Sequence, residues 1–401
     1  MNKKLYDDAL QIINYSIREV LPEKAVRKAL EGFVKPNGKT IMVSIGKAAY
    51  SMAKETLNNI DIDIGLVITK YNHAQDALPN TTIIEAGHPI LDENSLKGTQ
   101  FAIDLCQNLT CDDTVVMLIS GGGSALFEMP LVSLEELQDI SSQLLKCGAN
   151  INEINIIRKR LSKVKGGRFA KICEPAKVIN IILSDIINDP LDMIASGPTC
   201  PDLSTCQEAL DIVNKYHLNI KKETLELLKL ETIKNLDNIV TYITGNNEQL
   251  KLAAKRKALQ LGYETIYIDE AITSEAKDAA SFMIEQIEQH KNHRPIAIIA
   301  GGEIVVEVKG NGLGGRNQEL SLRCAPFIKD KDICFFAIGS DGTDGPTDAA
   351  GAYCDSDTCK EDIETYSSNN DSYHYFEKYG GLIKTRPTGT NVCDLYVALL
   401  K

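Results

Sequence analysis

The sequence predicts an α/β protein built from two domains, and three observations lead to this class. Short apolar runs, typical of the fully buried strands of a parallel sheet, alternate with longer segments of helical pattern. The chain has 401 residues, which is more than one ordinary hydrophobic core holds. The alternation of strands and helices gives way to a polar helical stretch and then restarts, so we expect one domain over residues 1–237 and a second, smaller one over 238–401.

The composition is that of a globular enzyme, with 43% hydrophobic and 24% charged residues. A net charge of −12 argues against non-specific nucleic-acid binding, which needs a basic surface. The chain holds no apolar run long enough for a transmembrane helix, and its first residues lack the apolar core of a signal peptide. The 11 cysteines form no C-x-x-C pair, so we expect free thiols in a reducing cytoplasm. From the charge and the hydropathy we expect neither membrane nor nucleic-acid partners.

The first domain begins with two amphipathic helices over residues 5–33, separated near Pro22. Apolar runs then predict strands at 41–45, 66–69, 82–86, 115–119 and 177–183. Helical patterns predict helices at 47–57, at about 94–106, at 133–146, at 150–160 and within 204–237.

The run 115–119 ends in Ser120-Gly121-Gly122-Gly123-Ser124. Glycines with positive φ allow backbone N–H groups to approach a ligand closely, and Ser124 is a candidate N-cap for a following helix. A strand, a glycine turn and a helix N-terminus together form an anion site, and phosphate is the expected anion. The alternative is a tight turn without a ligand, but the two flanking hydroxyls favour phosphate.

Two further residues of the first domain are candidates for ligand contact. Lys47 is expected in the first turn of a helix at the carboxyl end of strand 41–45, where ligands bind in open α/β sheets. The segment is not a P-loop, because Ala48 stands where Ser or Thr would bind Mg²⁺. His88 follows strand 82–86 in a loop. For Lys47 the alternative is a solvated lysine on a helix.

The segment 158–168 carries six cations and no acid, including Arg158 and Lys165. It forms either a solvated helix face or a basic wall beside a phosphate. Asp185 and Asp189 follow strand 177–183, where carboxylates act as Mg²⁺ ligands or a general base, or else cap turns.

In the second domain, apolar runs predict strands at 239–243, 263–268, 296–300, 304–308 and 335–340. Helices are expected at about 247–261, at 273–290, after residue 316 and after the polar loop 385–391. The segment 310–315 fits G-x-G-x-x-G, but the strand before it belongs to an expected hairpin rather than a βαβ unit. We therefore interpret it as a glycine loop that presents Arg316 at a helix N-terminus for phosphate binding. The acids of 341–348 bind a divalent ion or form Asx turns.

These segments together resemble the class II glycerate kinases, the glycerate 2-kinase family with a C-terminal MOFRL domain. The segments that carry the resemblance in the first half are Gly46-Lys47-Ala48-Ala49, Gly87-His88-Pro89, Ser120-Gly121-Gly122-Gly123-Ser124-Ala125, Arg158-Lys159, Lys165-Gly166-Gly167 and Ala195-Ser196-Gly197-Pro198-Thr199. Those in the second half are Gly301-Gly302-Glu303, Gly314-Gly315-Arg316-Asn317-Gln318-Glu319, residues 341–351 and Thr388-Gly389-Thr390-Asn391.

The resemblance implies a Rossmann-like, three-layer αβα first domain, a smaller α/β second domain and an active site in the cleft between them. It implies Mg²⁺- and ATP-dependent phosphorylation of D-glycerate to 2-phosphoglycerate. The catalytic residues it implies are Lys47, Asp189, Glu303 and Arg316. Asn188 and Cys393 depart from the family pattern; Asn tolerates the left-handed turn expected at 188.

We expect direct, in-line transfer of the γ-phosphoryl group, with domain closure to exclude water. Residues 120–124 and Lys165 are expected to bind ATP, and Asp189, Glu303 and Asp341 to hold Mg²⁺. Substrate contacts are expected from His88, Arg158, Thr390 and Asn391. The expected partners are D-glycerate and ATP, and the expected state is a monomer or homodimer.

Three alternatives stay open from the sequence. The first is a kinase for another small hydroxy or sugar acid. The second is a hydroxypyruvate reductase, for which the G-x-G-x-x-G match is the support. The third is a non-catalytic nucleotide sensor.

Overall fold

The computed structural model describes residues 2–292 and 295–401, and the chain divides into two compact units. The inserted unit comprises residues 25–183 and 189–244. The terminal unit comprises residues 1–24, 184–188 and 245–401. The predicted division at 237/238 differs from this one by a few residues, and it differs more at the start of the chain, because residues 1–24 belong with the second half.

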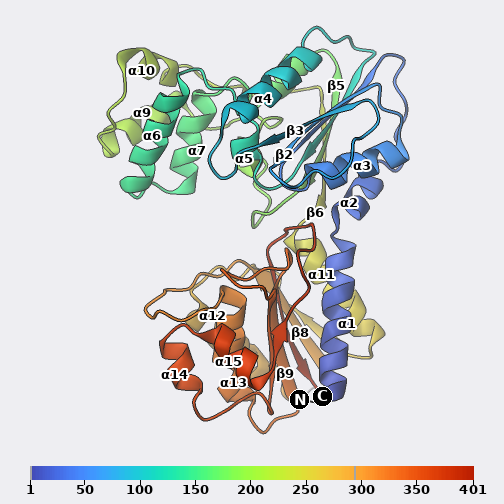
Figure 1. The fold of residues 1–401 in the computed structure, drawn as a ribbon, viewed down its shortest axis with the longest axis vertical. Helices are drawn as coiled ribbons and strands as arrows, with labels where there is room; N and C mark the ends of the chain where they lie inside the picture. Colours follow the sequence, from blue (N-terminus) through green and yellow to red (C-terminus); the bar gives the residue numbers. More distant parts are fainter. Residues whose placement is uncertain (1, 293–294) are drawn as a thin grey trace. The chain divides into compact units, whose positions relative to one another are not determined.

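Helix α1 (Lys3–Glu19) explains why the start of the chain joins the terminal unit. Its buried residues recur at helical spacing and form one apolar face: Leu5, Ala9, Ile12, Ile13 and Ile17. This face packs on α11 (Asn247–Gln260), as Figure 1 shows, and the Tyr263 hydroxyl donates to Asp8 at 2.8 Å. The break predicted near Pro22 is confirmed, since α2 (Pro22–Ala29) begins there.

The inserted unit is built on a six-stranded sheet in the order β3-β2-β1-β4-β5-β6. The strands are β1 (Thr40–Ile45), β2 (Ile64–Lys70), β3 (Thr81–Ala86), β4 (Thr114–Ile119), β5 (Lys177–Leu183) and β6 (Ile239–Gly245). The pairs from β3 through β5 are parallel, and this is the strand order of Rossmann-type sheets. Every residue of β1 and β4 is buried, and each buried Val, Leu or Ile contributes about 1.5–3 kcal/mol. The predicted α/β class is confirmed.

Helices pack on this sheet and also form a cluster beside it (Figure 1). Those on or near the sheet are α3 (Ala49–Asn59), α4 (Glu93–Cys106), α5 (Gly123–Leu126) and α8 (Arg168–Cys173). Those of the cluster are α6 (Leu134–Lys146), α7 (Ile151–Arg160), α9 (Cys206–Lys215) and α10 (Lys222–Leu228). The cluster has its own apolar core, which includes Leu137, Leu144, Ile157 and Leu228. The predicted helices 133–146 and 150–160 are confirmed, with Ser133 and Asn150 as N-caps.

The terminal unit holds a second, mixed sheet in the order β11-β10-β9-β12-β8-β7. Its strands are β7 (Glu264–Tyr267), β8 (Ile296–Gly302), β9 (Ile333–Gly339), β10 (Gly351–Asp355), β11 (Leu382–Ile383) and β12 (Asp394–Leu400). Its further helices are α12 (Ala276–His290), α13 (Arg316–Ile328), α14 (Ile363–Ser368) and α15 (Ser372–Tyr379). An apolar core lies between the sheet and α12 and α13.

The predicted final helix is wrong, because residues 394–400 form β12 instead. This strand lies between β8 and β9 and pairs antiparallel with both. The run Leu395–Leu400 is apolar throughout, so its pattern does not distinguish a buried strand from a short buried helix. Tertiary pairing decides the outcome.

The predicted strand 304–308 is also wrong. Its only pairing in the described ranges is an isolated bridge between Val305 and Glu275. Val305 is 59% exposed and Val308 is 70% exposed. The alternating pattern does not join β8 as a neighbouring strand, because β12 and β7 already occupy both edges of β8.

Two further predictions have plain outcomes. All 11 cysteines are free of disulfides, as expected. None of the described helices is both long and apolar enough to span a membrane.

Candidate active site

The loops after β1 and β4 meet in the inserted unit at the point where the strand order reverses. β1 and β4 are neighbours in the sheet; the chain adds β2 and β3 on one side of this pair and β5 and β6 on the other. The Lys47 amide donates to the Gly121 carbonyl at 2.9 Å, and the Ala48 amide donates to the Ser120 hydroxyl at 3.0 Å. Such a reversal opens a crevice at the carboxyl ends of the strands, which is where ligands bind in this type of sheet.

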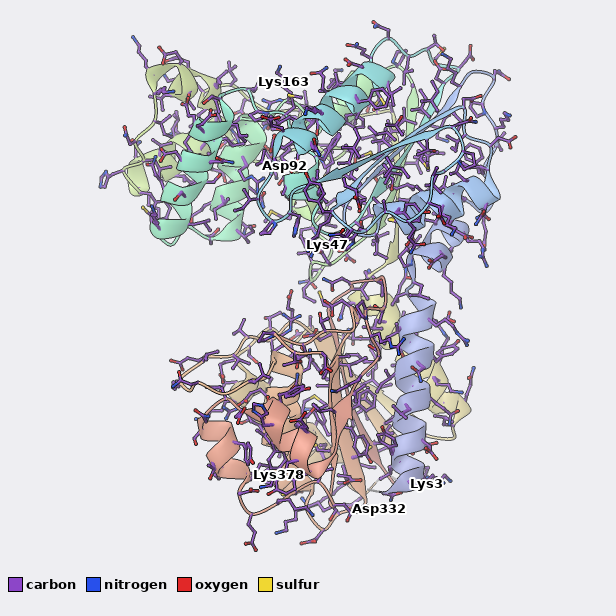
Figure 2. The ribbon with its side chains drawn as sticks, viewed as in Figure 1. Lys3, Lys47, Asp92, Lys163, Asp332 and Lys378 are labelled. Atoms are coloured by element: carbon purple, nitrogen blue, oxygen red, sulfur yellow. The ribbon has the colours of Figure 1, made fainter. Side chains whose placement is uncertain are left out.

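Lys47 and His88 lie against the glycine loop at this point. A Cβ added to Gly122, whose φ is +88°, would come within 3.0 Å of the His88 ring and 3.3 Å of Lys47 Cγ. The Lys47 side chain is exposed (Figure 2), and its carbonyl is 3.0 Å from Nδ1 of His73. Burial lowers the pKa of His88, and the charge of Lys47 lowers it further, so the ring is neutral at pH 7. Lys47 thus supplies the positive charge beside a loop that only glycine permits.

The predicted helix starts around this loop need correction. α3 begins at Ala49, so Lys47 lies just before the helix and not in its first turn. Ser124 is not an N-cap, because Gly122 takes that position and α5 lasts a single turn. The Ser124 hydroxyl instead lies 3.2 Å from the Ser196 hydroxyl. A helix of one turn carries little dipole, so the charge available to an anion comes mainly from Lys47.

The basic segment 158–168 is largely internal, so it is not a solvated face. Lys165 is fully buried, and its ammonium group donates to the carbonyls of Phe127 and Ala195 at 3.0 and 3.2 Å. Glu128, also buried, lies 3.7 Å from this group. Burial lowers the pKa of Lys165 to about 8, and Glu128 acts in the opposite direction. Arg158 donates to the Ser124 carbonyl at 2.9 Å, so the segment supports the glycine loop from within the unit.

Asp189 lies in a loop of unusual backbone geometry after β5. It is partly buried, and both it and Asn188 have positive φ, at 51° and 65°. The left-handed turn expected at Asn188 is therefore present. Asn and Asp adopt this conformation more readily than other residues with a side chain, so the pair forms a sharp turn at this place.

The terminal unit holds a second set of charged residues around Arg316, the first residue of α13. Its guanidinium group makes a two-pronged contact with Asp394, with Nε and Nη2 at 2.6 and 3.0 Å from the carboxylate oxygens. Nη1 donates to Glu303 at 3.0 Å. These bonds use three of the five N–H donors of an arginine, and 35% of the side chain is exposed. Burial raises the pKa of Asp394 to about 6, while the Arg316 bonds act in the opposite direction.

A groove of about 610 Å³ runs beside Arg316. Its lining includes Val306, Val308, the glycine loop before α13 and Asp341. No strand precedes this glycine loop within residues 303–310 apart from the bridge at Val305, so the G-x-G-x-x-G match lacks the strand of a dinucleotide site.

Two acids of the loop 341–348 differ in burial and in their hydrogen-bond partners. Asp344 is buried and accepts from the amides of Asn317 and Gln318 at 3.0 and 2.8 Å, so it caps α13. Burial raises the pKa of Asp344. Asp341 accepts from the Thr343 amide at 2.9 Å, which is an Asx turn. The Asx interpretation thus holds for Asp341, whereas Asp344 caps a helix whose residues Asn317 and Gln318 lie far from it in the chain.

The residues present fit an Mg²⁺ ion that is bound together with phosphates. In the described part of the chain, no group of three or more His, Cys, Asp or Glu is arranged to hold a metal. Mg²⁺ at phosphate-transfer sites needs only one or two carboxylates besides phosphate oxygens and waters. Glu303, whose side chain is 45% exposed, and the partly buried Asp341 and Asp189 are carboxylates of that kind.

The loop before β12 is held within the terminal unit. The Thr390 hydroxyl, which is buried, donates to the Val20 carbonyl at 2.9 Å, and Asn391 accepts from the Cys393 amide at 3.2 Å. The Cys393 thiol donates to the Asp185 carbonyl at 3.2 Å and lies 3.9 Å from Glu303. Cys393 has a φ of 64°, so this departure from the family pattern lies in a left-handed turn beside Glu303.

Sequence reasoning missed Asp394 and Glu128, which hold Arg316 and Lys165. Asp394 is the one acid at the head of the apolar run 395–400, and Glu128 is the one acid between the glycine loop and Pro130. An isolated acid in apolar surroundings signals a buried partner, and this signal was present in the sequence.

Comparison with known proteins places the chain in a family. The model of a domain of unknown function, DUF4147, matches residues 8–229, and the MOFRL family model matches residues 296–394. The D-glycerate 2-kinase of Thermotoga maritima is 44% identical, over 98% of this chain and 97% of that protein. The glycerate 2-kinase of Pyrococcus horikoshii is 38% identical, over 90% of this chain and 88% of that protein. A crystal structure of the Thermotoga maritima glycerate kinase matches with a TM-score of 0.96 at 43% identity and covers 100% of both chains. The chain therefore belongs to the glycerate 2-kinase family that carries a MOFRL domain.

Proposed function

We propose that this protein transfers the γ-phosphoryl group of ATP to the 2-hydroxyl group of D-glycerate, giving 2-phosphoglycerate. The observation that carries the proposal is the similarity to the Thermotoga maritima D-glycerate 2-kinase over 98% of the chain. The geometry supports it, because each unit presents one exposed or partly exposed cation, Lys47 or Arg316, beside a glycine loop. We further propose that both units serve this one reaction.

In this mechanism the protein acts mainly by positioning and charge neutralisation, as phosphoryl transfer requires. The backbone of residues 120–124 and the Lys47 ammonium group bind phosphate oxygens. Arg316 is held flat by Asp394 and Glu303 and turns its remaining N–H donors to the carboxylate of glycerate, which suits a planar guanidinium.

Asp189 orients the attacking hydroxyl group and accepts its proton. The glycerate hydroxyl attacks the γ-phosphorus of ATP in line with the P–O bond to the β-phosphate. That bond breaks, and ADP leaves. Asp189 in the inserted unit, or Glu303 and Asp341 in the terminal unit, would hold Mg²⁺, and the ion would supply charge neutralisation on the phosphates. His88, neutral at pH 7, is a hydrogen-bonding partner for substrate beside Lys47.

The test is ADP release from Mg·ATP with D-glycerate, with the product identified by ³¹P NMR. A 2-phosphate product that depends on both substrates supports the proposal. Turnover with a different hydroxy acid alone would replace the acceptor but retain the kinase. NADH oxidation with hydroxypyruvate, without ADP release, would favour the reductase instead, and nucleotide binding without turnover would favour a sensor.

A further inference from the structure

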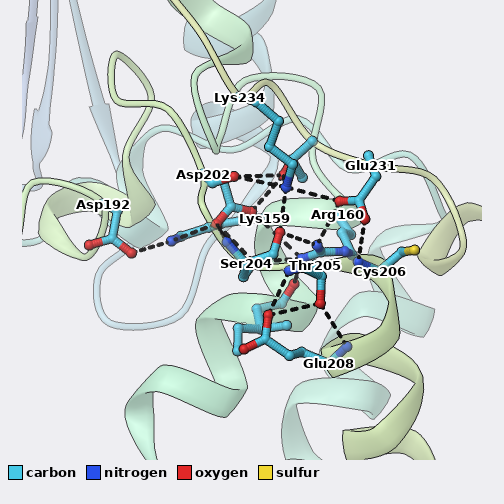
Figure 3. Close-up of polar contacts among 12 residues, drawn as sticks. Lys159, Arg160, Asp192, Asp202, Ser204, Thr205, Cys206, Glu208, Glu231 and Lys234 are labelled. Carbon is cyan, nitrogen blue, oxygen red and sulfur yellow. Dashed lines mark hydrogen bonds and ion pairs between the residues drawn. The ribbon is translucent and has the colours of Figure 1, made fainter.

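A network of buried ion pairs joins the end of α7 to the segment that follows Asp189 (Figure 3). Lys159 and Arg160 are both buried, and both pair with the buried Asp202, at 3.4 and 3.6 Å. Asp202 also accepts from the hydroxyl groups of Ser204 and Thr232 at 2.8 and 2.9 Å. These contacts pair the buried charges of the cluster and hold the far end of the segment.

Lys159 makes its shortest contact with a different carboxylate, that of Asp192, at 2.7 Å (Figure 3). Only 2% of the Lys159 side chain is exposed, but 43% of the Asp192 side chain is. A half-exposed carboxylate gains little stability from one ion pair. The pair therefore does more to fix where Asp192 lies than to stabilise the core.

Asp192 is linked to Asp189 by a closed turn. The amides of Met193 and Ile194 both donate to the Pro190 carbonyl, at 2.8 and 3.2 Å. Asp189 directly precedes this turn and has a left-handed backbone, with a φ of 51°. A fixed Asp192 therefore fixes the turn, and the turn fixes the direction in which the chain presents Asp189.

The residues that follow the turn, 195–197, are also held by backbone hydrogen bonds. Ala195, Ser196 and Gly197 have φ values of 52°, 61° and 63°. The Gly166 and Gly167 amides donate to the carbonyls of Ser196 and Gly197, at 3.1 and 2.7 Å. Such a run of left-handed residues persists only when surrounding contacts impose it.

We propose that Lys159 and Asp192 are positioning residues, whose ion pair holds the turn 190–193 so that Asp189 faces the reacting hydroxyl group. This inference rests on the role proposed above for Asp189. Neither residue touches the reactants; they act through the backbone of the turn.

The test is the variant Asp192→Asn, which removes the charge but keeps the size of a half-exposed side chain. Lys159 keeps Asp202 as a partner, so the variant is expected to fold. The turnover number kcat should fall between tenfold and about 100-fold, the loss expected from a misplaced group, while KM for ATP stays unchanged. Hydrogen exchange at the Met193 and Ile194 amides should become faster. Asp192→Glu, which restores the charge, should recover part of kcat.

The matched control is Glu226→Gln, which removes an exposed acid that pairs with Lys229 at 2.7 Å in the same unit. It should change neither kcat nor exchange in the turn. Faster exchange with an unchanged kcat would overturn the proposal, and so would a lost kcat with unchanged exchange, which would make Asp192 a group in contact with the reactants. If the wild-type protein makes no 2-phosphoglycerate, the proposed function fails, whereas the exchange measurement still reports whether the ion pair holds the turn.

Discussion

The contact between Arg316 and Asp394 allows a quantitative prediction, tested by the variant Asp394→Asn. Asparagine keeps the size of the side chain but replaces one carboxylate oxygen with an NH₂ group that faces the guanidinium group. Asp394 is 1% exposed and accepts two bonds from Arg316, at 2.6 and 3.0 Å. The variant therefore removes the negative charge from a buried pair and leaves one amide oxygen to accept from Arg316, whose bond to Glu303 is kept.

The magnitude follows from the burial of the two partners. Breaking a fully buried ion pair costs about 3–5 kcal/mol. Arg316 is 35% exposed and keeps its bond to Glu303 at 3.0 Å, so we expect the lower figure of about 2 kcal/mol that applies to a hydrogen bond to a charged group. If this loss falls on the orientation of Arg316 toward glycerate, kcat/KM for glycerate drops by about 30-fold, at 1.36 kcal/mol for each factor of ten.

The assay is steady-state ADP release at saturating ATP with D-glycerate varied, accompanied by thermal unfolding of each variant. Asp362→Asn is the matched control, because Asp362 lies in the same unit and pairs with Lys378 at 3.2 Å on the surface. Arg316→Lys provides a second variant that keeps the charge but loses the planar contact, and it should lower kcat/KM in the same direction. A folded Asp394→Asn variant with kcat/KM within twofold of wild type would refute the reasoning.

Three further predictions concern the inserted unit. Lys47→Ala should lower kcat by orders of magnitude, while the unfolding temperature stays within a few degrees, because the side chain is exposed; near-normal turnover would remove Lys47 from the mechanism. Gly122→Ala should raise KM for ATP several-fold, because its Cβ would crowd His88 and Lys47. Gly148→Ala is the control for backbone strain alone, since Gly148 also has positive φ but has nothing within 4 Å. Equal effects of the two substitutions on KM would contradict the crowding argument. Because the pKa of His88 is lowered on folding, the unfolded state binds its proton first, so this residue should contribute stability above its unfolded pKa, near 6.5, that is lost as pH falls below it. Unfolding temperatures of wild type and His88→Asn between pH 5 and 7 should therefore differ in slope, with the variant less sensitive to acid; parallel slopes would contradict this.

The sequence predicted most of the first sheet because its strands are continuous apolar runs bounded by glycines and polar loops. The run 115–119 forms a buried strand, as expected, and of the three glycines after it Gly122 has the positive φ. The predicted start of a helix was wrong where the φ angle of one residue decides it. Gly122 takes the cap position ahead of Ser124, and this choice depends on the close packing of His88 and Lys47 around the loop.

Long-range pairing was beyond reach of the sequence pattern. The strand β12 and the packing of α1 on α11 both depend on residues far away in the chain. The burial of the basic segment 158–168 could not be predicted either, because the acids that pair with it, Glu128 and Asp202, lie on other segments. Local composition shows that charges are present, whereas only the fold shows that they are paired.

The place of β12 in its sheet has a consequence for biosynthesis. The strands β8 and β9 leave the ribosome well before residues 394–400, yet β12 is the strand that joins them in the sheet. Until β12 emerges, each presents a bare row of backbone donors and acceptors, which is a template for pairing with other chains. The inserted unit needs only residues that emerge earlier. Nascent or truncated chains that stop short of residue 394 are therefore expected to combine a folded inserted unit with an aggregation-prone remainder, and purified protein should be screened for such products.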